Sequence, residues 1–363
     1  MVSPLFQPVA FSDLPGWNGD DQLPAFQAFR RSAFRVTEKP YRTGSLGVGR
    51  DAFGEAQTTA RNHPPSMTDA ARAFFETHFV ACRIAEPGFV TGFYEPAVMA
   101  SPVETGRFRV PLMERPDDLV DIDDANRPDG LDPYLAFGRR VAGVIQEYPD
   151  RQAIESGAIA RHARAIAWVE DKVDAFFVHV QGAARLIMPD GSRRRVTYAA
   201  KSGQRFTGPG GVLADIGELP REKVTMQSIR AWFRANPDRV DEILWTNRSY
   251  IFFREAEVDD PDLGPVAAAK VPLTAGRSVA VDRQLHTFGT PFYIDAPTLT
   301  AFDGAPFRRL MIAQDTGSAI VGAARGDLFA GSGDAAGEIA GVVRNAATVY
   351  ALIPRSLFEA PGR

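Results

Sequence analysis

Three aspartates in the last hundred residues have surroundings that suit acid–base chemistry. Asp315 follows an apolar run, Asp327 lies between Gly326 and Leu328 after a glycine-rich stretch, and Asp282 ends another short apolar run. Carboxylates at strand ends, beside glycines that let a substrate approach the backbone, can exchange a proton with a glycosidic oxygen. Asp also caps turns with its own side chain, so spacing alone leaves a structural role open for each of the three.

Two further segments have side chains suited to a sugar. Thr91-Gly-Phe-Tyr-Glu-Pro96 brings together a hydroxyl, two aromatic rings and a carboxylate, and Tyr94 is one of those rings. Gln181, in the segment Phe176–Leu186, could reach a sugar hydroxyl. A buried strand explains either segment as well, so the residues alone do not decide between binding and packing.

Composition excludes several classes of function. The net charge of -4 gives no field that would hold a nucleic acid. Cys82 is the single cysteine, so no disulfide can form within the chain and no cysteine-based metal site can be built. The five histidines are widely scattered, with no pair four residues apart on one helix: His63, His78, His162, His179 and His286. We expect no metal and no cofactor.

The elements that must position these residues alternate between short strands and a few helices. Hydrophobic periodicity and cap residues predict helices over Asp20–Ala33, from a capping box at Ser66-Met-Thr-Asp69 to about Val80, from Thr225, from Asp238 and from Asp334. Strand signals cover Gly88–Ala97, Ile166–Trp168, Ala175–Val180, Tyr250–Phe253, Ser278–Val281, Phe292–Ile294, Arg309–Ala313 and Thr348–Ile353. Asp190-Gly191 between Arg185–Met188 and Arg193–Tyr198 predicts a hairpin.

A chain of 363 residues is long for one domain, and two domains are expected. The acidic, proline-containing segment Val258–Pro265 is the best candidate linker. The first residues have no basic segment followed by an apolar run and no early cysteine, so no export signal is visible. No later stretch has the roughly 18 consecutive apolar residues of a membrane span, so we expect no transmembrane segment.

Six motifs, taken in order, resemble the membrane-bound lytic murein transglycosylase A (MltA) family. They are TGFYEP from Thr91, DAFFVHVQGAARL from Asp174, TMQSIRAWFRANP from Thr225, NRSYIFF from Asn247, VPLTAGRSVAVD from Val271 and MIAQDTGSAIVGAARGDLFAGSGDAAGE from Met311. The C-terminal part also resembles the 3D domain, named for three aspartates that match Asp282, Asp315 and Asp327.

The resemblance implies a mainly β fold with a few helices. A double-psi β-barrel (3D) domain would be built from residues 1–96 and 258–363. Residues 97–257 would form an inserted, MltA-specific β-rich domain. The substrate groove of the family lies between the two.

The resemblance also implies an activity, which is cleavage of peptidoglycan glycan strands to give 1,6-anhydro-MurNAc ends. Asp327 matches the catalytic acid and base, while Asp315 and Asp282 match supporting carboxylates. Thr91, Tyr94 and Gln181 match substrate-binding positions. Such an enzyme needs no cofactor, its partner is the glycan strand, and it works in the periplasm or cell envelope.

To act as an acid near neutral pH, Asp327 needs a pKa well above the usual value of about 3.9. Leu328 and Phe329 could supply the apolar surroundings, with repulsion from Asp315 adding to their effect. Where relatives of the barrel often have His-Phe-Asp, this chain has Arg325-Gly326-Asp327, and that difference changes the packing beside the carboxylate. QGAAR and DTGSAI, where QGSGR and DTGGAI are expected, are smaller departures.

Two other readings stay open. A chain whose aspartates only cap turns would bind peptidoglycan without cleaving it, as expansin-like proteins do with their walls. A hydrolytic glycosidase would use a second carboxylate, Asp315 or Asp282, together with Asp327.

Overall fold

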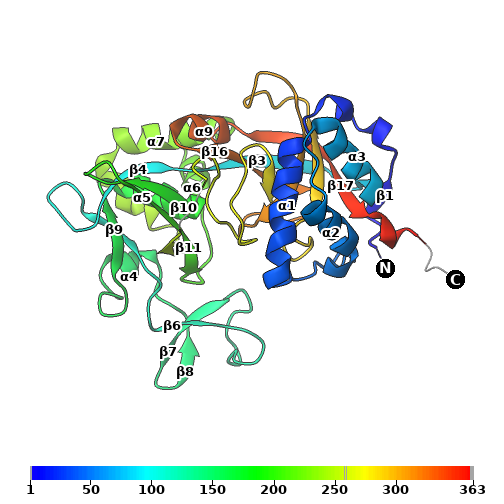
Figure 1. The fold of residues 1–363 in the computed structure, drawn as a ribbon. Coiled ribbons are helices and arrows are strands. Elements are labelled where there is room, and N and C mark those ends of the chain that lie inside the picture. The colour runs from blue at the N-terminus through cyan, green and yellow to red at the C-terminus, as the bar shows by residue number, and fades with distance from the viewer. Residues whose placement is uncertain (1, 257, 259, 360–363) are drawn as a thin grey trace. The chain divides into compact units, whose positions relative to one another are not determined.

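The computed structural model describes residues 2–256, 258 and 260–359, and the chain divides into two compact units. One unit contains the residues up to Tyr94 together with those from Val258 onward, and the other spans residues 95–257. We predicted boundaries at 96/97 and 257/258. Of the predicted linker Val258–Pro265, Asp259 lies outside the described residues. Figure 1 shows the chain as a ribbon, coloured from blue at the N-terminus to red at the C-terminus.

The first unit is built on an eight-stranded sheet. Its strands are β1 (Phe6–Pro8), β2 (Phe79–Ile84), β3 (Gly88–Glu95), β13 (Ser278–Ala280), β14 (Pro291–Ala296), β15 (Phe307–Asp315), β16 (Arg325–Ser332) and β17 (Arg344–Pro354). The order is β1-β2-β17-β14-β15-β13-β16-β3, and β3 pairs back onto β17. Six strands therefore form a closed ring, which leaves no free edge among them. The crossing loops that define a double-psi barrel stay a prediction.

Helices α1 (Leu23–Glu38), α2 (Gly54–Asn62) and α3 (Thr68–His78) belong to the same unit, as does α9 (Asp334–Ala340). Aromatic side chains from α1 and α3 pack edge to face around the start of β2: Phe26, Phe29, Phe74, Phe75 and Phe79. Such pairs bury large apolar areas in a preferred geometry. Among the described residues, no helix is both long and apolar enough to cross a bilayer.

The predicted capping box at the start of α3 is wrong. The helix begins at Thr68 with Met67 as its N-cap, and no side chain caps it. Ser66 thus lies before the cap position, and Asp69 forms an ion pair with Arg72. The helix ends at His78, because the next residues form β2.

The described residues of the second unit, 95–256, form a six-stranded sheet, a small three-stranded sheet and five α-helices. The main sheet has the order β12 (Ile251–Glu255), β11 (Arg193–Lys201), β10 (Ala183–Ile187), β4 (Ala97–Ser101), β9 (Ala165–Val169) and β5 (Val110–Met113). The small sheet contains β6 (Leu119–Asp121), β7 (Phe137–Val141) and β8 (Val144–Gln146). The helices are α4 (Arg151–Glu155), α5 (Lys172–Gln181), α6 (Pro209–Asp215), α7 (Met226–Ala235) and α8 (Val240–Leu244).

Local signals in this unit are confirmed at two places. The predicted hairpin is the β10–β11 pair, with Gly191 at φ 82° in its turn. The helix predicted from Thr225 is α7, and the Thr225 hydroxyl accepts a hydrogen bond from the Ser228 N–H. With these sheets at the centre of both units, the prediction of a mainly β fold is confirmed.

The strand predicted over Ala175–Val180 is wrong, because this segment is the buried part of α5. Asp171 caps the helix by accepting from the N–H groups of Val173 and Asp174, and Gly182 ends it at φ 74°. A short apolar run without polar alternation looks the same in a buried strand and a buried helix. The cap residues on either side of the run carried the missing information.

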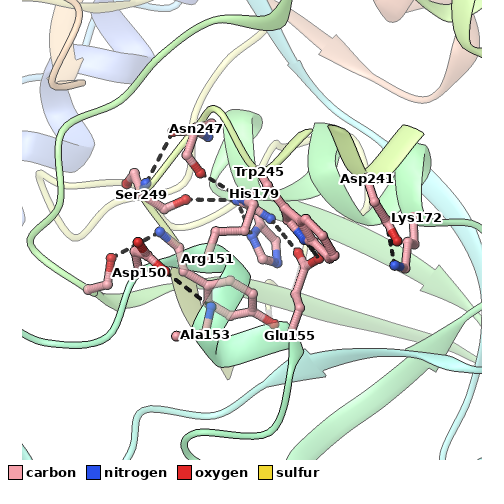
Figure 2. Close-up of polar contacts among 12 residues, drawn as sticks. Asp150, Arg151, Ala153, Glu155, Lys172, His179, Asp241, Trp245, Asn247 and Ser249 are labelled. Atoms are coloured by element: carbon pink, nitrogen blue, oxygen red, sulfur yellow. Dashed lines mark hydrogen bonds and ion pairs between the residues drawn. The ribbon is translucent and has the colours of Figure 1, made fainter. Parts of the chain in front are cut away.

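A buried arginine fixes α5 to its neighbours (Figure 2). The Arg151 guanidinium donates to the backbone carbonyls of Asn247 (3.2 Å) and Ser249 (2.8 Å), and to Glu155 Oε1 at 3.0 Å. It also lies 3.1 Å from His179 Nδ1. Arginine can only donate, so this nitrogen accepts and the His179 ring is neutral. Burial, followed by the charge of Arg151, holds the pKa of His179 well below its usual value.

Candidate active site

Strand pairing brings two of the three predicted carboxylates onto one face of the closed sheet. Ala280 of β13 pairs with Asp315 on one side and with Asp327 on the other. The pairing of β13 with β15 shifts register just before Ala280, so β15 has one extra residue there. Asp315 Oδ1 accepts from the N–H of Ala268, whose neighbour Ala267 packs against the apolar cluster that contains Ala280, and this places the carboxyl group on the side of Ala280. Paired strands lie about 4.8 Å apart, so the Cα atoms of Asp315 and Asp327 are roughly 10 Å apart. Asp315 is the last residue of β15, as predicted. Asp327 is the third residue of β16.

Gly326, next to Asp327, identifies the inner face of the ring. A Cβ at Gly326 would contact side chains of three other strands: Val90, Val279 and Ile294. Strand β14, which contains Ile294, is not a neighbour of β16, so these contacts cross the interior of the closed sheet. Successive residues of a strand point to opposite faces, and Asp327 therefore points outward.

The outer face beside Asp327 is apolar. A small buried cluster there contains Phe93, Leu273, Ala280, Ile320 and Phe329. Phe329 follows Asp327 by two residues and packs on Phe93, with ring centroids 5.3 Å apart. Leu328 belongs instead to the main core. Of the apolar neighbours predicted for Asp327, Phe329 shares its face and Leu328 does not.

A short chain of hydrogen bonds holds the Asp327 carboxylate. The Thr91 hydroxyl of β3 is hydrogen-bonded to Asp327 Oδ1. Arg325 Nη2 donates to the same hydroxyl oxygen at 2.7 Å. Arg325 precedes Asp327 by two residues and so shares its face of β16. All three side chains are half-buried.

The surroundings favour the protonated forms of both carboxyl groups. Desolvation raises the pKa of Asp327, while the hydrogen bond from Thr91 and the charge of Arg325 act against that rise. Desolvation raises the pKa of Asp315 to about 6, and the charge of Asp327 adds to the rise. Backbone N–H groups of Thr316 and Ala268 oppose it, the latter at 3.1 Å from Oδ1. Both carboxyl groups therefore keep a proton closer to neutral pH than a free aspartate does.

Asp282 has a different environment, in which both carboxylate oxygens accept backbone hydrogen bonds. Oδ1 accepts from the Gln284 N–H at 3.0 Å, and Oδ2 accepts from the Gly322 N–H at 3.1 Å. Asp282 thus caps the turn after β13 and ties it to the connection between β15 and β16. The geometry favours the turn-capping role that the sequence left open.

The connection between β15 and β16 has further anchors. The Thr316 hydroxyl donates to the Val281 carbonyl at 2.8 Å. His286 Nε2 lies 2.8 Å from the Ala323 carbonyl, so this nitrogen carries the hydrogen. Burial lowers the pKa of His286 to about 4, and the ring is neutral.

Comparison with known proteins assigns the chain to a family. The model of the MltA specific insert domain matches residues 89–254, and the 3D domain model matches residues 277–353. The crystal structure of a membrane-bound lytic murein transglycosylase from Agrobacterium tumefaciens is 52% identical, covers 97% of this chain and 98% of that one, and superposes with a TM-score of 0.92. The chain belongs to the lytic murein transglycosylase A family.

Two further members of the family match at lower identity. MltA from Neisseria gonorrhoeae is 32% identical, with 96% of this chain and 92% of that one covered and a TM-score of 0.78. The Escherichia coli K12 protein is 31% identical over 268 residues, which span 72% of this chain and 64% of that protein. A crystal structure of E. coli MltA holds chitohexaose, and it matches 96% of this chain and 94% of that one at 25% identity and a TM-score of 0.67.

Tyr94 and Gln181, which match substrate-binding positions of the MltA family, have surroundings that differ from those of Thr91. Tyr94 follows Thr91 by three residues, so the two point to opposite faces of β3. Tyr94 is buried, and a Cβ at Gly337 of α9 would lie 2.8 Å from its ring. Gln181 is the last residue of α5 and is half-buried in the other unit. Within the first unit, the structure brings together Thr91, Asp315 and Asp327.

Sequence reasoning missed the contribution of Arg325 and His286 to this site. The position of Arg325 could have been predicted, because residues two apart on a strand lie on the same face and Arg325 precedes Asp327 by two. For His286 there was none, because its partner Ala323 is 37 residues further along the chain.

One group of potential metal ligands is present in the described part of the second unit. Ligand atoms of Asp117, Asp118 and His162 lie within 4.8 Å of one another. Arg139 Nε is 2.6 Å from Asp118 Oδ2, and the Tyr148 hydroxyl donates to Asp118 Oδ1 at 2.7 Å. The central carboxylate already has a cation and a donor, so we assign this group to an ion-pair cluster. No role in the family's chemistry is attributed to it.

Proposed function

We propose that the chain is a lytic transglycosylase that cleaves the MurNAc–GlcNAc bond of peptidoglycan without water. The observation that carries the proposal is the desolvated carboxyl group of Asp327, whose pKa is raised and whose Oδ1 is held by Thr91. Membership of the MltA family and the chitohexaose complex of the E. coli relative support a glycan substrate.

In this mechanism Asp327 acts twice. It first gives its proton to the oxygen that leaves the anomeric carbon of MurNAc, and the glycosidic bond breaks. The resulting carboxylate then takes the proton of the C6 hydroxyl of the same sugar, and that oxygen closes onto the anomeric carbon. The product is a 1,6-anhydro-MurNAc end, and Asp327 is protonated again. Water is not consumed, and neither a metal nor a cofactor takes part.

A hydrolase is the second candidate, and Asp315 is the observation that favours it. Inverting glycosidases place two carboxyl groups about 6.5–9.5 Å apart, with a water between them. A Cα separation of roughly 10 Å across Ala280 is compatible with that spacing. The hydrolase would release reducing ends in place of anhydro ends.

Digestion of purified sacculi, followed by mass spectrometry of the fragments, tests the proposal. The wild-type chain should release anhydro-MurNAc ends. Asp327→Asn should lower the rate by about 10²–10⁴-fold, the usual contribution of a general acid. Asp315→Asn is the matched control and should retain more activity than Asp327→Asn. Reducing ends from the wild type would mean hydrolysis, intact glycan would mean binding only, and an active Asp327→Asn variant would remove Asp327 from the role.

We also propose that the chain works in the cell envelope, where this substrate lies, and that it acts in the periplasm. Fractionation of cells that express the chain at its natural level tests this location. Recovery in the cytoplasmic fraction alone would contradict it.

A further inference from the structure

The donors and acceptors around Asp327 leave one arrangement for the hydroxyl hydrogen of Thr91. A guanidinium can only donate, so the Thr91 oxygen accepts from Arg325 Nη2 at 2.7 Å. An ionised carboxylate can only accept, so the Thr91 hydrogen points at Asp327 Oδ1. Arg325, Thr91 and Asp327 thus form a relay with a fixed direction.

Arg325 is itself held in place on two sides. Its guanidinium carbon lies 5.4 Å from the centroid of the Phe89 ring, which is cation–π distance. Nη1 donates to the carbonyls of Gly326 and Phe89, the latter at 3.4 Å. Since Nη1 and the ring fix the plane of the guanidinium, Nη2 has little freedom to turn away from Thr91.

The two oxygens of Asp327 therefore differ. Oδ1 receives the Thr91 hydrogen, whereas Oδ2 accepts no hydrogen bond from any residue in the part of the chain that the structure describes. When the ionised carboxylate takes up a proton, Oδ1 is already occupied by the Thr91 hydrogen bond, and Oδ2 is open to the proton.

We propose that Arg325 is a positioning residue that orients the Thr91 hydroxyl toward Asp327 Oδ1 and so reserves Oδ2 for the proton exchanged with substrate. This inference deepens the proposed function and rests on Asp327 being its acid. Arg325 acts only through Thr91 and does not itself exchange the proton.

The elements that pack against β16 also have charged side chains. Besides Arg325 on the same strand, they are Asp315 on β15 and Lys270, which acts on Asp315. Arg344 of β17 pairs with Thr91 in the sheet and is exposed. Asp334 and Glu338 are exposed on α9, which packs against β16.

Carbon-13 NMR of the full chain, with labelled aspartate carboxyl groups, measures the titration of Asp327 directly and does not depend on enzymatic activity. The Asp327 signal is identified by its loss in Asp327→Asn. Arg325→Met removes a positive charge, and Thr91→Val removes a hydrogen bond, each of which lowers the pKa of Asp327, so the titration midpoint should rise by about one pH unit in either variant. Thr91→Ser keeps the hydroxyl and should restore the wild-type midpoint.

Kinetics supply the second readout. Arg325→Met and Thr91→Val should each lower kcat by about tenfold, the worth of one hydrogen bond, with little change in KM. The double variant should lose no more than either single variant, because both changes break the same relay. The limb of the pH profile set by Asp327 should move to higher pH in parallel with the NMR midpoint.

Arg50→Gln removes an equal charge from an exposed site of the same unit and is the control for charge alone. An unmoved Asp327 midpoint in both Arg325→Met and Thr91→Val would overturn the inference, and so would additive losses in the double variant. Should Arg325→Met fail to fold, Thr91→Val and Arg325→Lys give the same comparison. If the Asp327 midpoint shifts in these variants but the wild-type chain makes no anhydro ends, the role of Arg325 is supported and the proposed function is rejected.

Discussion

Asp315 and Asp327 lie on one face but are held by different partners. Asp327 receives a side-chain hydrogen bond from Thr91, which belongs to a neighbouring strand. Asp315 receives backbone N–H groups, among them that of Ala268 at 3.1 Å. Backbone donors fix a carboxylate more firmly than a side chain that can rotate. Asp327 therefore has the freer oxygen, which suits a group that must give away its proton and take it back.

The raised pKa of Asp315 predicts a pH-dependent cost to stability. Because the folded pKa of about 6 exceeds the usual 3.8, the folded chain holds a proton more strongly than the unfolded chain between these values. Stability contributed by this group is present at pH 4 and is lost as pH rises through 6. Asp315→Asn cannot ionise and should raise Tm at pH 8 but not at pH 4.

The effect should be on the order of 1 kcal/mol at pH 8, because the side chain is partly exposed and solvent reduces the full effect of the shift. Thermal unfolding at pH 4, 6 and 8 measures it, with Asp51→Asn at an exposed site as the control. A gain of the same size at all three pH values would mean that the charge of Asp315 is not its cause.

At the scale of elements, the connection between β15 and β16 determines how Asp315 and Asp327 are placed relative to each other. Asp282 accepts from Gly322, the Thr316 hydroxyl donates to Val281, and His286 donates to Ala323. These contacts join the connection to the chain that follows β13, the strand that lies between β15 and β16. Asp282, Thr316 and His286 thus hold the connection in place, whereas the chemistry is proposed for Asp327.

His286 should make this unit sensitive to acid. Its folded pKa of about 4 lies below the usual 6.5, so the unfolded chain takes up a proton first as pH falls. Stability is therefore lost between pH 6.5 and 4, by about 3 kcal/mol in all. His286→Gln keeps an N–H donor for the Ala323 carbonyl and does not titrate.

Urea unfolding between pH 4.5 and 7.5 measures the difference. The slope of unfolding free energy against pH reports the number of protons taken up on unfolding, and in His286→Gln this number should be smaller by up to one over this range. The pKa of His179, in the other unit, is also lowered, so a pH dependence should remain in both the wild type and His286→Gln. Identical slopes would show that His286 is not protonated on unfolding.

At the scale of the whole molecule, each unit has apolar cores of its own. The second unit contains three sizeable buried clusters, one of which lies among α5, α6, α7 and α8. It begins with Glu95, which is fully buried and forms ion pairs with Arg185 at 2.8 Å and Arg195 at 2.7 Å. Both arginines belong to the same unit, so its first residue is anchored within it.

A fragment of residues 95–257 should therefore fold by itself. We expect a dispersed amide NMR spectrum and one cooperative thermal transition. The fragment should release no anhydro ends from sacculi, since it lacks Asp327. A collapsed state without fixed side-chain signals would instead mean that the cores of the insert depend on the other unit.

The sequence by itself determined the features that arise from neighbouring residues. Asp190-Gly191 predicts the β10–β11 hairpin, Thr225 predicts the start of α7, and the ordered motifs from Thr91 to Glu338 identify the family. Turn and cap chemistry act over three or four residues, so they can be read locally. The three aspartates were also found this way, although their separate roles were not.

Tertiary structure alone decided which of these residues meet. Thr91 and Asp327 are hydrogen-bonded although 236 positions separate them, and Ala280 aligns Asp315 with Asp327. Pairing register and desolvation depend on strands distant in sequence, and no local periodicity encodes them.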